Sequence, residues 1–168
     1  MKILLTTLNT KYVHTNIALK YLYETVKEKD VDLKEYSINE PIGKILRDIN
    51  SYNADILAFS VYIWNVEETL KICENIKKIQ HNVKIILGGP EVTYRSEEIL
   101  KQNEFIDYII VGEGEETFPK LINFLESKYT IDNLASTDSS SKNDETIIEH
   151  VSYRNGDKII VGDIGLVC

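Results

Sequence analysis

Short apolar segments alternate five times with segments of helical periodicity along residues 2–125 of this 168-residue chain. Regular alternation of this kind predicts an α/β protein, with a parallel sheet covered by helices on both faces. Because crossovers between parallel strands are right-handed, the simplest topology is a doubly wound five-stranded sheet, flavodoxin-like or Rossmann-like, with the order 2-1-3-4-5. The expected strands are Lys2–Leu8, Val31–Ile38, Ala54–Val61, Val83–Leu87 and Ile106–Val111.

The segments between these strands have the sequence signals of helices. Pro41 precedes apolar residues at helical spacing, and proline is common at the first helical position. The expected helices are His14–Lys29, a helix from Pro41 onward, Val66–Ile79, Glu97–Gln102 and Glu116–Leu125.

The composition changes after residue 127. Residues 128–146 include three consecutive serines among Asp, Asn and Lys, and a segment this poor in apolar side chains is expected to be a flexible linker. In residues 147–168, the segments Ile147–Tyr153 and Lys158–Val161 flank Asn155-Gly156, which is a strong β-hairpin signal. The chain is therefore expected to comprise a domain at 1–127, a linker and a C-terminal β-hairpin appendage.

Charge and hydropathy exclude several classes of partner. The net charge of −8 disfavours binding to nucleic acid or to an anionic membrane, and no apolar run has the length of a membrane span. Polar residues soon interrupt the apolar N-terminus, so it is interpreted as the first strand of a cytoplasmic protein rather than as a signal peptide.

The two cysteines, Cys73 and Cys168, provide neither a disulfide framework nor a metal cluster. Cys73 stands among isoleucine and leucine residues, where a small buried side chain is expected. An iron–sulfur cluster cannot be built from this pair.

Two glycine turns follow neighbouring expected strands, Gly88-Gly89-Pro90-Glu91 and Gly112-Glu113-Gly114. Ligands of doubly wound sheets bind beyond the carboxyl ends of the strands. Glycine lets the chain turn sharply and lets a bulky ligand approach the main-chain amides. One such turn alone indicates only the end of a strand, whereas two together favour the floor of a site for a large flat ligand.

Three further side chains fall at this edge, directly at the end of the third strand. The rings of Tyr62 and Trp64 either contact a flat ligand or pack against the protein. The Ser60 hydroxyl either donates to a ligand or satisfies a backbone carbonyl.

The acidic residues and His14 have simpler explanations than catalysis. Glu115 and Glu116 are expected to stabilise the positive end of the helix that starts there, and no sequence pattern pairs Glu91 or Glu113 with a nucleophile. His14 either caps or packs the first loop or ligates a metal such as cobalt. A ligating histidine usually has an acidic or carbonyl partner.

The sequence lacks the residues that other ligand sites of this architecture require. The first loop, Asn9–His14, contains no glycine, so the dinucleotide pattern G-x-G-x-x-G is missing, as is the glycine of a flavin phosphate loop. The acidic residues of a phospho-acceptor domain are absent after the first and third strands, and no Walker loop or nucleophile elbow occurs.

Four segments nevertheless resemble the cobalamin-binding domain at the front of many radical SAM proteins. They are Asn9–Asn16 with the helix start Ala18–Leu22, Ala58–Asn65, Leu87–Val92 and Val111–Glu115, and the hairpin Val151–Val161 is similar to the segment that leads into the radical SAM barrel. The resemblance implies cobalamin contacts, with the nucleotide tail near Ser60 and the corrin edge along Gly112–Gly114. The residues it implies are Asn9, Tyr12, His14, Ser60, Tyr62, Trp64, Gly88, Gly89, Pro90, Glu91, Gly112, Glu113 and Gly114.

The resemblance also implies that this chain is one part of a larger enzyme. The CxxxCxxC motif of the radical SAM barrel is missing, so the iron–sulfur cluster and S-adenosylmethionine would belong to a downstream domain. Such enzymes use cobalamin to carry a methyl group or as a redox partner. This chain alone is expected to catalyse nothing.

One motif departs from the best-known cobalamin domains, which carry D-x-H-x-x-G. Here Tyr12 replaces the aspartate and Ile17 the glycine, so only His14 remains, and we expect cobalt to lack a protein histidine ligand. Two alternatives stay open: a domain of this fold that has lost its cofactor and serves in docking or substrate recognition, and a flavin- or nucleotide-binding domain.

Overall fold

A computed structural model describes residues 1–10, 16–134 and 148–164. Its strands are β1 Ile3–Asn9, β2 Val31–Ser37, β3 Ile56–Ser60, β4 Lys84–Gly88, β5 Tyr108–Ile110, β6 Val151–Asn155 and β7 Lys158–Ile160. Its helices are α1 Ile17–Val26, α2 Ile42–Tyr52, α3 Val66–Ile79, α4 Pro90–Thr93, α5 Ser96–Gln102 and α6 Gly114–Leu134.

The strands form one sheet in the order β2-β1-β3-β4-β5-β6-β7. The first five are parallel, which confirms the expected order 2-1-3-4-5. The C-terminal hairpin is also confirmed, but it is continuous with the sheet, because β6 pairs antiparallel with β5 and places Ser152 opposite Ile109. Gly156 adopts a φ of 57° in the hairpin turn, the left-handed conformation that the Asn-Gly pair predicts.

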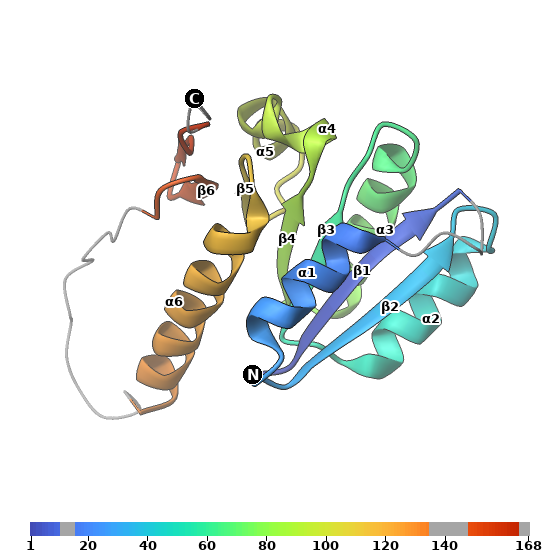
Figure 1. Cartoon of the computed structure of the whole chain (residues 1–168), viewed down its shortest axis with the longest axis horizontal. Coiled ribbons are helices and arrows are strands. Elements are labelled where there is room, and N and C mark those ends of the chain that lie inside the picture. The colour runs from blue at the N-terminus through green and yellow to red at the C-terminus, as the bar shows by residue number, and fades with distance from the viewer. Residues whose placement is uncertain (11–15, 135–147, 165–168) are drawn as a thin grey trace.

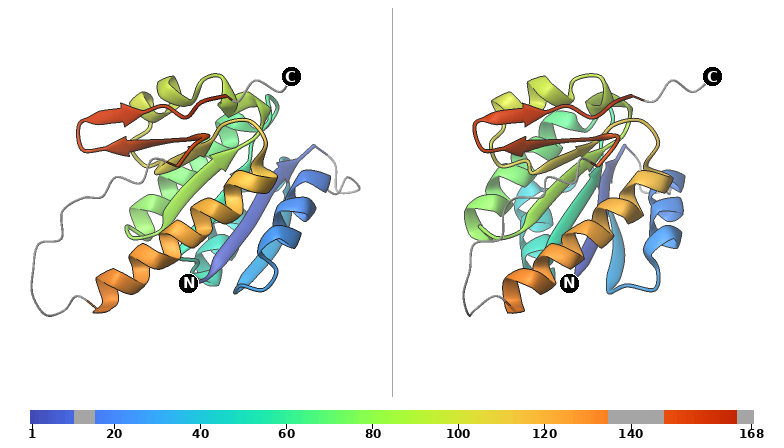
Figure 2. Two further views of the ribbon diagram at one scale, coloured as in Figure 1. Left: turned by 60° about the vertical axis from the view of Figure 1, so that its left-hand side comes forward. Right: turned by 90° about the vertical axis from the view of Figure 1, so that its left-hand side faces the viewer.

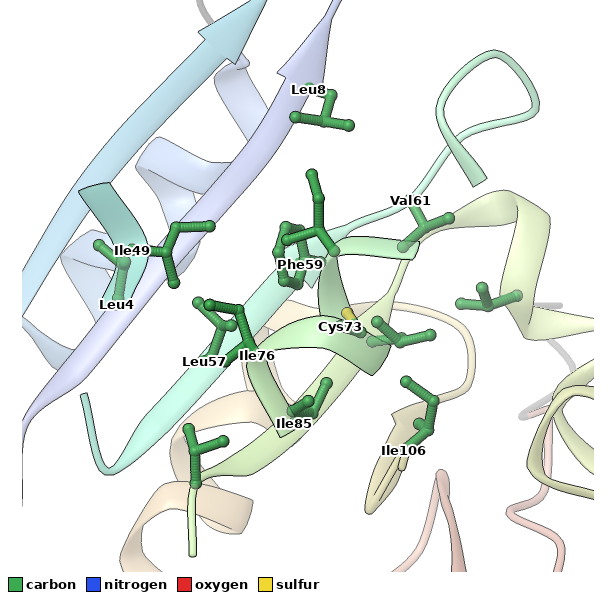
Figure 3. Close-up of a cluster of buried hydrophobic side chains, with 14 of the residues drawn as sticks. Leu4, Leu8, Ile49, Leu57, Phe59, Val61, Cys73, Ile76, Ile85 and Ile106 are labelled. Atoms are coloured by element: carbon green, nitrogen blue, oxygen red, sulfur yellow. The ribbon is translucent and has the colours of Figure 1, made fainter. Parts of the chain in front are cut away.

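Helices cover both faces of the sheet (Figures 1 and 2). Along β3, Leu57 and Phe59 point into a core shared with α2, α3, α4 and α5, whereas Ile56 and Ala58 point into a core shared with α1 and α6. Figure 3 shows the first of these cores, in which Cys73 is fully buried, as expected. Burial on both faces explains why the central strands are so apolar.

The helices differ from the expected ones in several places. Helix α1 begins at Ile17 rather than at His14, because the Asn16 side chain accepts a hydrogen bond from the Leu19 amide as an N-cap. The short helix α4 was not expected. Helix α6 continues to Leu134 instead of ending at Leu125, so the first seven residues of the segment expected to be a linker are helical. Pro41 is the N-cap of α2.

Within the described parts of the chain, no helix combines the length and the apolar content that crossing a membrane requires.

Candidate functional site

A cavity of about 210 Å³ opens at the carboxyl edge of the parallel strands, between α1 and α6. Four neighbouring strands provide its apolar floor. The floor residues are Leu5, Ala58, Ile86 and Ile110; α1 contributes Ala18, Leu19 and Leu22, and α6 contributes Glu115 and Phe118. The remaining lining residues belong to strand ends and to the loops that follow them, which is where a doubly wound sheet binds its ligands.

The cavity brings together eight of the residues that the sequence singled out. They are Ser60, Tyr62, Gly88, Gly89, Pro90, Gly112, Glu113 and Gly114. Asn9, Trp64 and Glu91 are described but do not line it. Tyr12 and His14 lie outside the described residues. The two glycine turns therefore do lie at one site.

The sequence did not identify the apolar walls as part of the site, although Ala18–Leu22 belongs to the resembling segments. Ala18 and Leu22 of α1 and Phe118 of α6 have the spacing of core positions. Helical periodicity marks such residues as facing the sheet. It does not show that a cavity remains between the two helices.

One of the glycines is required by the protein itself. A Cβ on Gly89 would lie 2.4 Å from the Val61 carbonyl oxygen, and its φ is 115°. Close approach of the chain to itself therefore explains this residue. A Cβ on Gly114 would lie 3.0 Å from the Leu22 side chain, a tight contact where α6 begins against α1.

Gly88 has no such explanation. Its φ is not positive, and a Cβ there would lie 3.8 Å from the Ile110 Cβ, an ordinary van der Waals contact. Gly88 lies two residues after Ile86 in β4 and faces the cavity with it. The missing side chain therefore leaves open space in the cavity.

Ser60 places one polar group in this apolar surrounding. The residue is only 6% exposed and lies two residues after Ala58, on the same face of β3. Its carbonyl oxygen accepts a hydrogen bond of 2.8 Å from the Thr7 hydroxyl. The Ser60 hydroxyl itself bonds no described residue, so it is available to a ligand in the cavity.

The loop from β3 to α3 is fixed by a buried asparagine. Asn65 is fully buried; its Oδ1 accepts from the Tyr62 amide at 2.8 Å, and its Nδ2 donates to the Leu8 carbonyl at 3.0 Å. The Tyr62 ring, at the cavity rim, stacks on the ring of Trp64. This loop therefore presents a fixed aromatic pair beside the cavity.

The acidic residues beside the glycine turns support the structure. Glu115 and Glu116 lie in the first turn of α6, as expected for charges that stabilise a helix start. Glu91 forms an ion pair of 3.0 Å with Arg95, one turn further along the chain. Among the described residues, the cavity lining includes no Lys or Arg, and no group of three or more His, Cys, Asp and Glu side chains is arranged to hold a metal ion.

One known protein family matches most of the chain. The family model described as "B12 binding domain" matches residues 3–122. The chain is 31% identical over 108 residues to the cobalamin-dependent radical SAM methyltransferase TokK of Streptomyces tokunonensis. The aligned region covers 64% of this chain and 14% of that protein. The chain is also 28% identical over 128 residues to the anaerobic magnesium-protoporphyrin IX monomethyl ester cyclase of Cereibacter sphaeroides. That aligned region covers 76% of this chain and 19% of the cyclase.

A solved structure shares the fold. The cobalamin-dependent S-adenosylmethionine radical enzyme OxsB, in its apo form, superimposes with a TM-score of 0.63 at 16% identity, over 96% of this chain and 22% of that one. The chain thus spans less than a quarter of each of these proteins.

Proposed function

Because this chain belongs to the B12-binding domain family, we propose that it seats cobalamin at the cavity between α1 and α6. We further propose that it does so as the cofactor-binding part of a longer radical SAM enzyme, as the activities named for its relatives suggest. The observation that carries the proposal is the open floor at Gly88 beside the Ser60 hydroxyl, which bonds no described residue.

The size of the cavity indicates which part of the cofactor enters it. Its volume of about 210 Å³ is below the roughly 300–1,000 Å³ of pockets that enclose drug-sized ligands, yet above the roughly 150 Å³ that holds benzene. A corrin ring is too large for it. A flat bicyclic base on the nucleotide tail fits, with the corrin outside against the rim.

The residues of the chain divide into two roles. Apolar side chains of α1, α6 and the sheet would exclude water from the tail, and the Ser60 hydroxyl would be the polar group that holds it there. Tyr62, Gly112 and Glu113 lie in the loops at the rim, where they would orient the corrin. When bound, cobalamin supplies a cobalt centre that carries a methyl group or changes its oxidation state.

No described residue of the cavity is assigned a catalytic role. The iron–sulfur cluster and S-adenosylmethionine would be held by a downstream domain, and the reaction would be methyl transfer or another radical conversion. This division of labour agrees with the small share of each relative that the chain spans.

Titration with hydroxocobalamin tests the proposal. The chain should give a saturable shift in the corrin absorption bands, and Gly88→Val should weaken binding at least about tenfold because its methyl groups fill the floor. Valine favours strands, so the thermal unfolding temperature of Gly88→Val should stay near that of the wild type. Gly43→Val, in the first turn of α2 and away from the cavity, is the matched control and should bind normally.

Three results would contradict the proposal. No shift in the corrin bands would favour a domain that has lost its cofactor and serves in docking. A yellow chromophore that remains after purification would favour a flavin site. Equal affinity of Gly88→Val and Gly43→Val for hydroxocobalamin would show that the cofactor does not occupy the cavity floor.

A further inference from the structure

A single carboxylate from the edge strand joins the two ends of the β1–α1 loop. Glu35 lies in β2, on the same face as Val31 and Leu33, which pack toward α1. Its Oε2 accepts a hydrogen bond from the Asn9 side-chain amide at the end of β1, and another of 3.0 Å from the backbone N–H of Asn16 at the start of α1. Both ends of the loop are therefore tied to one oxygen atom.

The charge of Glu35 suits the end of the helix that it meets. Helix α1 has no acidic residue in its first turn. A carboxylate beside a helix N-terminus is favourable, and hydrogen bonds to an ionised acceptor are stronger than neutral ones. Glu35 thus supplies from a neighbouring strand the negative charge that α1 lacks.

Asn16, which Glu35 holds in place, in turn contacts a residue of the cavity. Its Oδ1 caps the Leu19 amide at 3.1 Å, and its Nδ2 donates to the Tyr62 hydroxyl at 3.2 Å. Because both ends of the amide are engaged, the side chain has one orientation. Tyr62 lines the cavity, so the path from Glu35 to the rim consists of two hydrogen-bonded steps.

We propose that Glu35 is a positioning residue for the cobalamin site: it fixes Asn16, and Asn16 fixes the phenol of Tyr62 at the rim. The inference rests on the proposed function. Glu35 does not line the cavity itself, and its path to Tyr62 at the rim passes through Asn16.

A double-mutant cycle on Glu35 and Tyr62 tests this role. Glu35→Gln keeps the size of the side chain but loses its charge and one acceptor oxygen, and Tyr62→Phe removes the hydroxyl that Asn16 binds. Dissociation constants for hydroxocobalamin are measured by corrin absorbance for the wild type, both variants and the double variant. Glu40→Gln is the matched charge control, because Glu40 accepts from the Ser37 amide and pairs with Lys44.

Glu35→Gln should weaken cobalamin binding about 5- to 20-fold, and the double variant should bind within about twofold of Tyr62→Phe alone, because Glu35 acts through the Tyr62 hydroxyl. Glu40→Gln should bind like the wild type. Wild-type affinity in Glu35→Gln, or losses that multiply in the double variant, would overturn the positioning role.

A second measurement separates this inference from the proposed function. Tyr62 stacks on Trp64, the chain's single tryptophan, so Glu35→Gln should change the Trp64 emission even without cobalamin. Unchanged emission overturns the positioning role by itself. A wild-type chain that fails to shift the corrin bands overturns the proposed function instead.

Discussion

The indole ring of Trp64 stacks on the phenol ring of Tyr62, with 4.6 Å between the ring centroids and 4° between the planes. Tyr62 faces the cavity, whereas Trp64 is 48% exposed beside it. The sequence left open whether these rings contact a ligand or pack against the protein. The structure shows that they pack on each other, and that only one of them lines the cavity.

Trp64 should report cobalamin binding by its fluorescence. Corrin absorption overlaps tryptophan emission, so a corrin at the rim should quench the emission by energy transfer. Adding hydroxocobalamin should therefore reduce the emission with the same dissociation constant as the shift in the corrin bands. Trp64→Phe should lose the emission but keep the band shift. Unchanged wild-type emission at saturation of the corrin bands would place the cofactor elsewhere.

Replacing Asn65 should loosen the loop that carries this aromatic pair. Asn65→Ala leaves the buried Tyr62 amide and Leu8 carbonyl without partners, which should cost about 2–3 kcal/mol. The thermal unfolding temperature should then fall by about 5–10 °C. Asn75→Ala, which removes a bond to the Lys71 carbonyl within α3, is the matched control. Equal stability of the two variants would show that Asn65 does not hold the loop.

The strand order and the shared position of the glycine turns followed from the sequence, because hydrophobic periodicity and right-handed crossovers restrict the topology. The bounds of α1 and α6 could not be predicted from the sequence. The Asn16 cap depends on where its side chain finds a donor, and residues 126–134 have too few apolar side chains to indicate a helix.

Much of the site depends on long-range contacts that no local pattern contains. Glu35 is 19 residues from Asn16 along the chain, and Asn65 is 57 residues from Leu8. In the sequence each is an ordinary polar residue. Only the pairing of β1 with β2 and β3 brings them to their partners.

Cys73 should not react with thiol reagents in the folded chain. The thiol is fully buried in the core, and this burial raises its pKa far above the ordinary value. Because the thiolate is the reactive form, a Cys168→Ser variant should react with Ellman's reagent at pH 8 only after unfolding. Rapid labelling of that variant in the folded state would show that this core opens readily.

The raised pKa of the Cys73 thiol also predicts how the stability of the fold changes with pH. The unfolded thiol ionises near pH 8.5, whereas the folded thiol stays protonated to higher pH. The folded state therefore binds more protons above pH 8.5, and the free energy of unfolding should fall as the pH rises. Urea unfolding of Cys168→Ser at pH 7 and pH 9.5 should show a loss that is smaller in the Cys73→Ala background. An equal loss of stability with and without Cys73→Ala would show that other titrating groups cause the pH dependence.

His14 is expected not to ligate cobalt, because the aspartate that would support it is replaced by Tyr12. The EPR spectrum of the chain with Co(II) cobalamin should be the same for the wild type and for His14→Ala. A nitrogen splitting that disappears in His14→Ala would overturn this prediction.

Gly89→Ala should damage the fold, in contrast to substitutions at Gly88. Its Cβ would lie 2.4 Å from the Val61 carbonyl oxygen and 3.0 Å from the Val61 nitrogen, on a backbone with a φ of 115°. We expect a loss of about 3 kcal/mol or more and a fall in unfolding temperature of at least about 6 °C. Gly112→Ala separates strain from collision, because Gly112 also has a positive φ, 79°, but its Cβ would meet no atom within 4 Å. Its loss should be near 1 kcal/mol. If both variants lost the same stability, contact with Val61 would not be the reason for glycine at position 89.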